Sequence, residues 1–149
     1  MEDFTGAYIE RRQDTEILYE KQRIVALHLG GVAIECRLKS LLSAYHQISD
    51  WDEKSQRQKC SMFNQHINNP GHSLMTAMRH MPDLWRRAKS NAEFLKHLNH
   101  IIYPLGATSI DYINLRYVSQ IISKEQSEKW KKSFDYVCAW LEKNKGVTL

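Results

Sequence analysis

Glu35 is the residue of this sequence whose type and position point most clearly to chemistry. It lies within the apolar run IVALHLGGVAIECRLKSLL, residues 24–42. In a helix its neighbours at i−4, i+3 and i+7 are Gly31, Leu38 and Leu42, so the carboxylate faces the core. A buried ionised carboxylate is costly unless a donor pairs with it. We therefore expect Glu35 to belong either to a structural ion pair or to a polar pocket.

Arg116 is the partner that the sequence suggests for Glu35. It lies in YINLRY, residues 112–117, between Leu115 and Tyr117 and shortly before the last predicted helix. A guanidinium is the natural bidentate partner of a buried carboxylate. We expect a Glu35–Arg116 pair at the centre of a pocket. Lys39, one helical turn after Glu35, is expected to supply positive charge for a ligand phosphate, and His72 and Tyr117 are expected to line the opening.

The elements that must position these residues are predicted to be helices. With six glycines and three prolines in 149 residues, the chain has long stretches free of helix breakers. The sequence predicts an all-α fold with no linker, and therefore a single domain over residues 1–149. Ser123 and Gln126 have the spacing of a capping box at the start of the last helix. The helices are expected at about 4–19, 22–46, 54–67, 73–80, 82–102 and 124–145, with an ordered loop at 103–119.

Gly30 and Gly31 lie in the middle of the second predicted helix, where each costs roughly 1 kcal/mol relative to alanine. Close approach of a crossing helix is the favoured explanation, ahead of backbone exposed to a ligand. In either case this part of the helix is expected at the centre of a bundle.

Composition narrows the function only modestly. The net charge of +4 permits an anionic partner but does not require one. Cys36, Cys60 and Cys138 have no CxxC spacing, so they are expected to be buried reduced thiols. No apolar run reaches the roughly 18–20 residues that span a bilayer, and the N-terminus has no signal pattern, so a cytoplasmic protein without membrane contact is expected.

Several common chemistries lack their motifs. The sequence contains no GxxxxGK[ST], GxGxxG or GxSxG pattern. His97 and His100 could share a helix face, but a third metal ligand is not indicated, so no metal or cofactor is expected. Trp85, Arg86 and Arg87 interleave aromatic and basic groups as in sites for single-stranded RNA, although a surface helix with Trp85 docked in the core is favoured.

Three motifs together resemble the HEPN (higher-eukaryote and prokaryote nucleotide-binding) family. ALHLGGVAIECRLKSLL is similar to the family's helix A-x-x-L-x-G-Y-x-x-E-C-x-L-K-A-L-L, Gly71-His72-Ser73-Leu74 is similar to its G/T-H-D-L element, and Leu115-Arg116-Tyr117 precedes a long final helix. The resemblance covers about residues 22–145. It implies an antiparallel bundle of four to five main helices that forms a homodimer.

The resemblance also bears on activity. Many HEPN proteins are ribonucleases with an Arg followed, after four to six residues, by a His. Here Arg116 stands at the arginine position, but Ile121, Ile122 and Ser123 occupy the expected histidine positions, and no histidine follows His100. Without an imidazole the usual general acid or base is missing. No catalytic residue is therefore expected.

The sequence thus predicts a non-catalytic HEPN-like protein that binds a nucleotide or RNA. The resemblance further implies a place in a defence or toxin–antitoxin system, with a minimal nucleotidyltransferase as partner. Two alternatives stay open. One is a protein–protein interaction module in which the Glu35–Arg116 pair is purely structural, and the other is a ribonuclease with a displaced histidine, His72 or His100. The predicted ligand-binding residues are Glu35, Lys39, His72, Arg116 and Tyr117.

Overall fold

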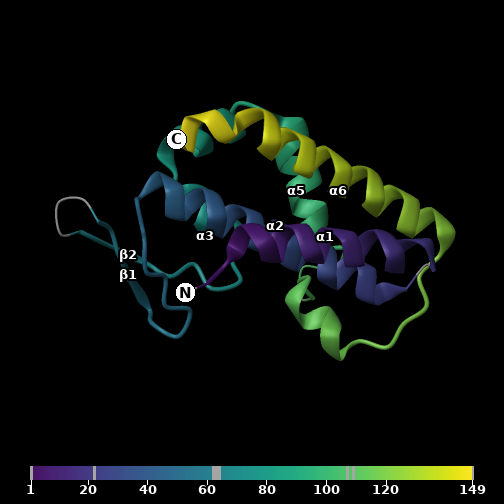
Figure 1. Cartoon of the computed structure of the whole chain (residues 1–149). Coiled ribbons are helices and arrows are strands. Elements are labelled where there is room, and N and C mark those ends of the chain that lie inside the picture. Colours follow the sequence, from purple (N-terminus) through teal and green to yellow (C-terminus); the bar gives the residue numbers. More distant parts are fainter. Residues whose placement is uncertain (1, 22, 62–64, 107, 109, 149) are drawn as a thin grey trace.

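The computed structural model describes residues 2–21, 23–61, 65–106, 108 and 110–148, and this part of the chain is largely helical (Figure 1). The predicted all-α fold is confirmed in so far as the described chain is mostly helical, but it also contains a small two-stranded sheet. The α-helices are α1 (Phe4–Glu20), α2 (Ile24–Tyr45), α3 (Leu74–Arg79), α4 (Pro82–Lys89), α5 (Ala92–Ile102) and α6 (Lys124–Asn144). Strands β1 (Arg57–Lys59) and β2 (His66–Asn68) and the 3₁₀ helices η1 (Ile113–Tyr117) and η2 (Lys145–Thr148) complete the described elements.

Helix α2 lies at the centre of the fold. It runs beside α1, and α6 crosses over the pair (Figure 1). The ring atoms of Trp130 lie 2.4 Å from where a Cβ on Gly30 would sit, and those of Tyr112 lie 2.2 Å from the corresponding point on Gly31. The two glycines therefore allow two aromatic rings to pack directly on the backbone of α2. The predicted close approach of a crossing helix is confirmed at Gly30, where α6 supplies Trp130. At Gly31 the ring comes instead from the segment before η1.

The segment predicted to be a helix at 54–67 instead contains the antiparallel pair β1–β2, with Gln58 opposite Ile67. The helix prediction is wrong because polar side chains here bond to nearby backbone groups, which competes with helical hydrogen bonding. The buried Gln58 side chain accepts from Asp52 N at 2.8 Å and donates to Asp52 O at 2.6 Å. Asn69 Nδ2 donates to the carbonyls of Glu53 and Ser55.

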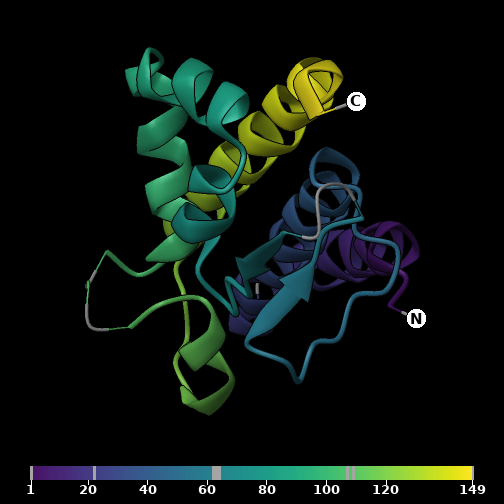
Figure 2. The same ribbon diagram turned by 90° about the vertical axis from the view of Figure 1, so that its left-hand side faces the viewer.

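The single helix predicted over 82–102 is two helices that meet at Ser90 and Asn91. Ser90 Oγ donates to Arg87 O, and Asn91 Oδ1 accepts from Phe94 N at 3.0 Å. Both residues prefer such capping positions to a helix interior. The break turns α4 away from α5. Helix α5 packs along α6, while α4 contacts η2 at the C-terminal end of α6 (Figure 2).

Helix α6 agrees closely with its sequence pattern. Ser123 and Gln126 form the expected capping box. The apolar face of α6 is buried at Trp130, Phe134, Val137, Cys138 and Leu141. None of the described helices is long and apolar enough to cross a membrane.

Candidate functional site

The carboxylate of Glu35 is enclosed by three donors. Lys39 Nζ lies 2.8 Å from Oε1, while His72 Nδ1 at 3.0 Å and the Tyr112 hydroxyl at 2.5 Å both contact Oε2. Lys39 comes from the next turn of α2, His72 from the loop before α3, and Tyr112 from the residue before η1. We call Glu35, Lys39, His72 and Tyr112 the Glu35 cluster. The sequence-based prediction that a buried acid requires polar partners is confirmed.

Lys39 is the most deeply buried charge of this cluster, with 1% of its surface exposed. Its ammonium also lies 2.5 Å from Glu53 Oε1, and it sits 5.7 Å from the ring centroid of Phe4 and 5.9 Å from that of Trp51. The indole N–H of Trp51 donates to the other oxygen of Glu53. Lys39 therefore links α1, α2 and the segment before β1, and its charge is compensated twice.

Burial and pairing oppose each other in setting the pKa values of the cluster. Burial alone would raise the pKa of Glu35, but Lys39 and the hydrogen bonds from Tyr112 and His72 outweigh it and lower the pKa below its ordinary value. Burial would lower the pKa of Lys39, but Glu35 and Glu53 raise it. Both groups are therefore ionised at neutral pH. Burial and the adjacent Glu35 carboxylate raise the pKa of Tyr112, which stays a hydrogen-bond donor.

Arg116 does not pair with Glu35, and this central expectation from the sequence is wrong. The Arg116 side chain is exposed, with its guanidinium carbon 4.8 Å from the ring centroid of Tyr117. The physical reason is the 3₁₀ turn of η1, in which residues three apart share a face. Tyr112 and Leu115 take the inward face, so Arg116 points outward and the phenol of Tyr112 reaches the carboxylate instead.

The five predicted ligand-binding residues therefore divide into two groups. Glu35, Lys39 and His72 meet in one cluster, whereas Arg116 and Tyr117 lie outside it. His72 is half exposed and lines a surface hollow with Tyr103 and Tyr112. Whether these residues bind a ligand stays a prediction.

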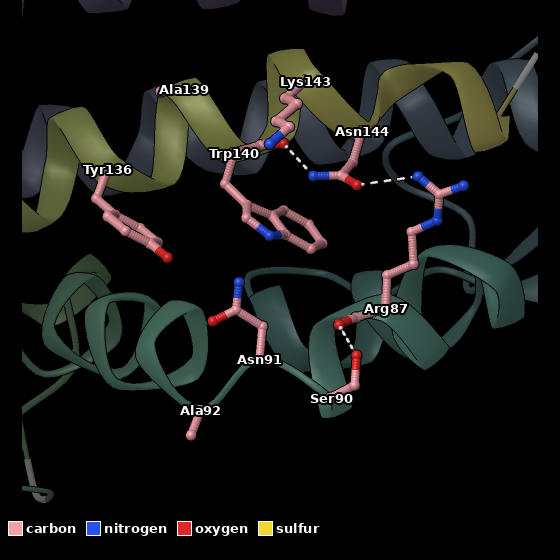
Figure 3. A pocket seen from close by; sticks show the side chains of 9 residues that line it. All are labelled: Arg87, Ser90, Asn91, Ala92, Tyr136, Ala139, Trp140, Lys143 and Asn144. Atoms are coloured by element: carbon pink, nitrogen blue, oxygen red, sulfur yellow. Dashed lines mark hydrogen bonds between the residues drawn. The ribbon is translucent and has the colours of Figure 1, made fainter.

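A second arrangement lies between α6 and the α4–α5 corner, where the sequence pointed to no joined site. A hollow of about 640 Å³ is lined by Arg87, Asn91, Tyr136, Trp140 and Lys143, among others. Figure 3 shows the rings of Tyr136 and Trp140 on one side of this hollow and Asn91 and Arg87 on the other. The Arg87 guanidinium is held by Asn144 Oδ1 at 3.1 Å.

A second hollow of about 500 Å³ adjoins the first and lies between α5 and α6. Lys96, His97 and His100 of α5 face Lys129 and Lys132 of α6 across it. The rings of His97 and Tyr136 lie 4.4 Å apart between centroids and so connect this hollow with the first. We call the two hollows together the α5–α6 groove. Among the described residues that line it there is no Asp or Glu.

The described residues contain no cluster of three or more His, Cys, Asp and Glu that could hold a metal ion. Cys36, Cys60 and Cys138 are free thiols. Burial raises the pKa of Cys36 to about 11 and that of Cys138 to about 11. Both therefore stay protonated at neutral pH and are poor nucleophiles.

The fold and these sites define a helical protein with a buried carboxylate–lysine cluster and a separate groove lined by cations and aromatic rings. No protein-family model, curated protein or solved structure matches the chain.

One pattern in the sequence could have indicated this groove. Lys129, Lys132, Tyr136, Trp140 and Lys143 follow one another at steps of three or four residues, which places cationic and aromatic side chains on one stripe of a helix. The spacing of His97 and His100 on one helix face does not by itself indicate a binding groove. Their contact with the stripe on α6 requires the tertiary packing of α5 on α6.

Proposed function

We propose that this protein binds single-stranded RNA, or the nucleotide unit of such a strand, in the α5–α6 groove without cleaving it. The observation that carries the proposal is the lining of the groove, where Arg87 and four lysines accompany aromatic rings and no described carboxylate is present. A cationic groove that follows the phosphates, with rings that stack on bases, is the usual construction of such sites.

The pairing of the lysines supports this location. Lys131 of α6, on another face, is held by both Glu16 and Asp135. In the groove, Lys129 pairs with Glu125 at 3.0 Å, but Lys96, Lys132 and Lys143 form no ion pair with any described residue. Like charges left uncompensated around one hollow raise the local potential and attract an anion.

The aromatic rings of the groove are held in place yet partly exposed. Trp140 stacks on Phe94 with ring centroids 3.8 Å apart, and Tyr136 packs on His97. Tyr103 lies at the opposite end of the groove. A ring that is already fixed loses little entropy when a base stacks on it, and such stacking contributes about 1–3 kcal/mol per base.

In this proposal the Glu35 cluster stabilises the fold and does not contact the ligand. The carboxylate of Glu35 and the ammonium of Lys39 are satisfied by partners within the protein, and Lys39 is almost fully buried. A ligand phosphate would have to displace Glu53 or Glu35 to reach Lys39. The link with a minimal nucleotidyltransferase in a toxin–antitoxin or defence system stays a prediction from the HEPN resemblance.

The experiment compares two charge-matched double variants. Lys96→Ala/Lys132→Ala removes two positive charges from the groove, and Lys54→Ala/Lys59→Ala removes two exposed charges near β1. Binding of a fluorescent oligoribonucleotide is measured over a range of salt concentrations. The groove variant is expected to weaken binding about tenfold and to reduce the salt slope by about 1.4, because each lost contact to a single strand contributes about 0.7. Equal effects of the two variants would contradict the proposal.

A second candidate function, a protein–protein interface, is favoured by a different observation. Tyr117 and Ile121 are 77% and 96% exposed, and beside them Ile24, Val25 and Val118 line a hollow of about 810 Å³. Large apolar side chains this exposed are typical of contact surfaces. The homodimer expected from the resemblance would use this surface, and light scattering of wild type and Ile121→Asp tests it. A wild-type protein that stays monomeric at high concentration would argue against it.

A further inference from the structure

The hydroxyl of Ser133 joins two histidines inside the α5–α6 groove. His97 Nδ1 lies 2.8 Å and His100 Nδ1 lies 2.9 Å from Ser133 Oγ, and Ser133 is only 3% exposed. On the far side of the His97 ring, Nε2 lies 3.0 Å from Glu93 Oε1. Glu93, His97, Ser133 and His100 therefore form a continuous chain of hydrogen bonds that ends at the second nitrogen of His100.

The positions of the protons in this chain follow from its ends. An ionised Glu93 can only accept, so His97 Nε2 carries a hydrogen. If His97 is neutral, its Nδ1 accepts the Ser133 hydrogen, and the serine oxygen in turn accepts from His100 Nδ1. A neutral His100 then has its lone pair on Nε2. His100 is partly exposed, and it lines the hollow.

One additional proton changes His100 Nε2 from an acceptor to a donor by either of two routes. The proton can bind directly at Nε2. Alternatively it binds at Nδ1 of His97, and the Ser133 hydroxyl turns to donate to His100 Nδ1. His100 then releases its Nδ1 hydrogen to solvent and takes one up at Nε2, so that the net gain is still one proton. In both states the number of hydrogen bonds is retained, and the donor belongs to a residue that lines the hollow. The outcome does not depend on which ring holds the charge.

The surroundings of His100 oppose this protonation while the hollow is empty. Burial, His97 and Lys129 lower the pKa of His100, in that order of size. Lys96 on α5, Lys132 on α6 and the phenol of Tyr103 also line the hollow. Of the nearby carboxylates, Glu93 is bonded to His97 and Glu125 is paired with Lys129. An anion that neutralises these cations removes the opposition.

We propose that the hollow at His100 is a site for a phosphate monoester, the terminal phosphate of an RNA strand or of a nucleotide, and that its binding is accompanied by the uptake of one proton. This inference rests on the proposed function. It refines that function by assigning the hollow at His100 to a terminal phosphate instead of an internal one. A monoester has three terminal oxygens and close to two negative charges at neutral pH. It therefore matches Lys96, Lys132 and the His100 donor better than an internal phosphodiester with one charge.

The test uses calorimetric titration at pH 7.0 in two buffers with different enthalpies of ionisation, since the difference counts the protons taken up. The probes are a hexauridylate with a 5′-phosphate, the same strand with a 5′-hydroxyl, and uridine monophosphate. The phosphorylated strand is expected to bind about tenfold more tightly than the hydroxyl strand, with uptake approaching one proton. Its advantage should shrink as the pH rises from 7 to 8.

His100→Gln should remove both the proton uptake and the preference for the phosphate, whereas His66→Gln, at an exposed position of β2, should retain both. The wild-type comparison of the two strands needs no variant and so stands if His100→Gln is poorly folded. If the 5′-phosphate and 5′-hydroxyl strands bind wild type equally well, and Lys96→Ala/Lys132→Ala weakens the binding of both, this inference is overturned while the proposed RNA binding stands. Proton-linked binding of uridine monophosphate without binding of either strand would retain the site and overturn RNA binding. Phosphate-dependent binding without proton uptake would overturn the coupling.

Discussion

Glu35→Gln is the substitution that most clearly separates a structural role of the Glu35 cluster from a ligand-binding role. Glutamine has nearly the shape of glutamate but removes the negative charge from beside Lys39 Nζ, 2.8 Å away. Lys39 is 1% exposed and cannot turn to solvent. Breaking a buried pair by removing one partner costs about 3–5 kcal/mol.

The lower end of that range applies here because Glu53 Oε1 still contacts the ammonium at 2.5 Å. We expect a loss of about 3 kcal/mol in the free energy of unfolding, measured by urea denaturation. At about 2–4 °C per kcal/mol for a chain of this size, the melting temperature should fall by about 6–12 °C.

The double variant Glu35→Gln/Lys39→Met completes a thermodynamic cycle. Lys39→Met alone leaves the buried Glu35 carboxylate without its main cation and should also destabilise. The double variant removes both charges, so its cost should be at least about 2 kcal/mol less than the sum of the two single costs. Additive costs, or a Glu35→Gln variant within about 0.5 kcal/mol of wild type, would show that the Glu35–Lys39 pair does not stabilise the fold.

Three further predictions follow from the same geometry. Gly31→Ala should cost about 1–3 kcal/mol in urea denaturation because its Cβ would lie 2.2 Å from the Tyr112 ring, and wild-type stability would contradict that packing. Arg116→Ala should change the unfolding free energy by less than about 0.5 kcal/mol in the same assay because the side chain is exposed. A large loss of stability would instead support a Glu35–Arg116 ion pair. Folding lowers the pKa of Glu35 below 4.5, so the ionised carboxylate should stabilise the folded state fully above pH 4.5. This stabilisation should be lost as the pH falls through the pKa of Glu35 in the folded state. Glu35→Gln should flatten this part of the plot of stability against pH, and identical plots for wild type and variant would contradict the lowered pKa.

Much of the helical framework could be predicted from periodicity and capping alone. The boundaries of α1, α2 and α6 follow from apolar spacing and from the Ser123 capping box. The errors lie where side chains bond to local backbone, as Gln58 does before the β1–β2 pair and Asn91 does between α4 and α5. Such competition depends on where each side chain points, which residue type and spacing do not determine.

The site was predicted in part for a similar reason. Burial of Glu35 follows from helix geometry and is confirmed. Lys39, one turn away, contacts the carboxylate directly as an ion-pair partner, a role that the sequence suggested for Arg116. Tyr112 could be predicted as a partner of Glu35 only if the orientation of η1 were known, because that orientation turns Tyr112 inward and Arg116 outward. A choice between two residues four apart in an irregular segment is made by packing, here by the space above Gly31.

Photo-crosslinking of a short RNA that contains 4-thiouridine tests the location of binding most directly. Peptide mapping should place the cross-links on Tyr103, Tyr136 and Trp140, the rings that line the α5–α6 groove. An excess of unlabelled strand should suppress these cross-links. Cross-links at Arg116 and Tyr117 instead, or none that an unlabelled strand suppresses, would contradict the account.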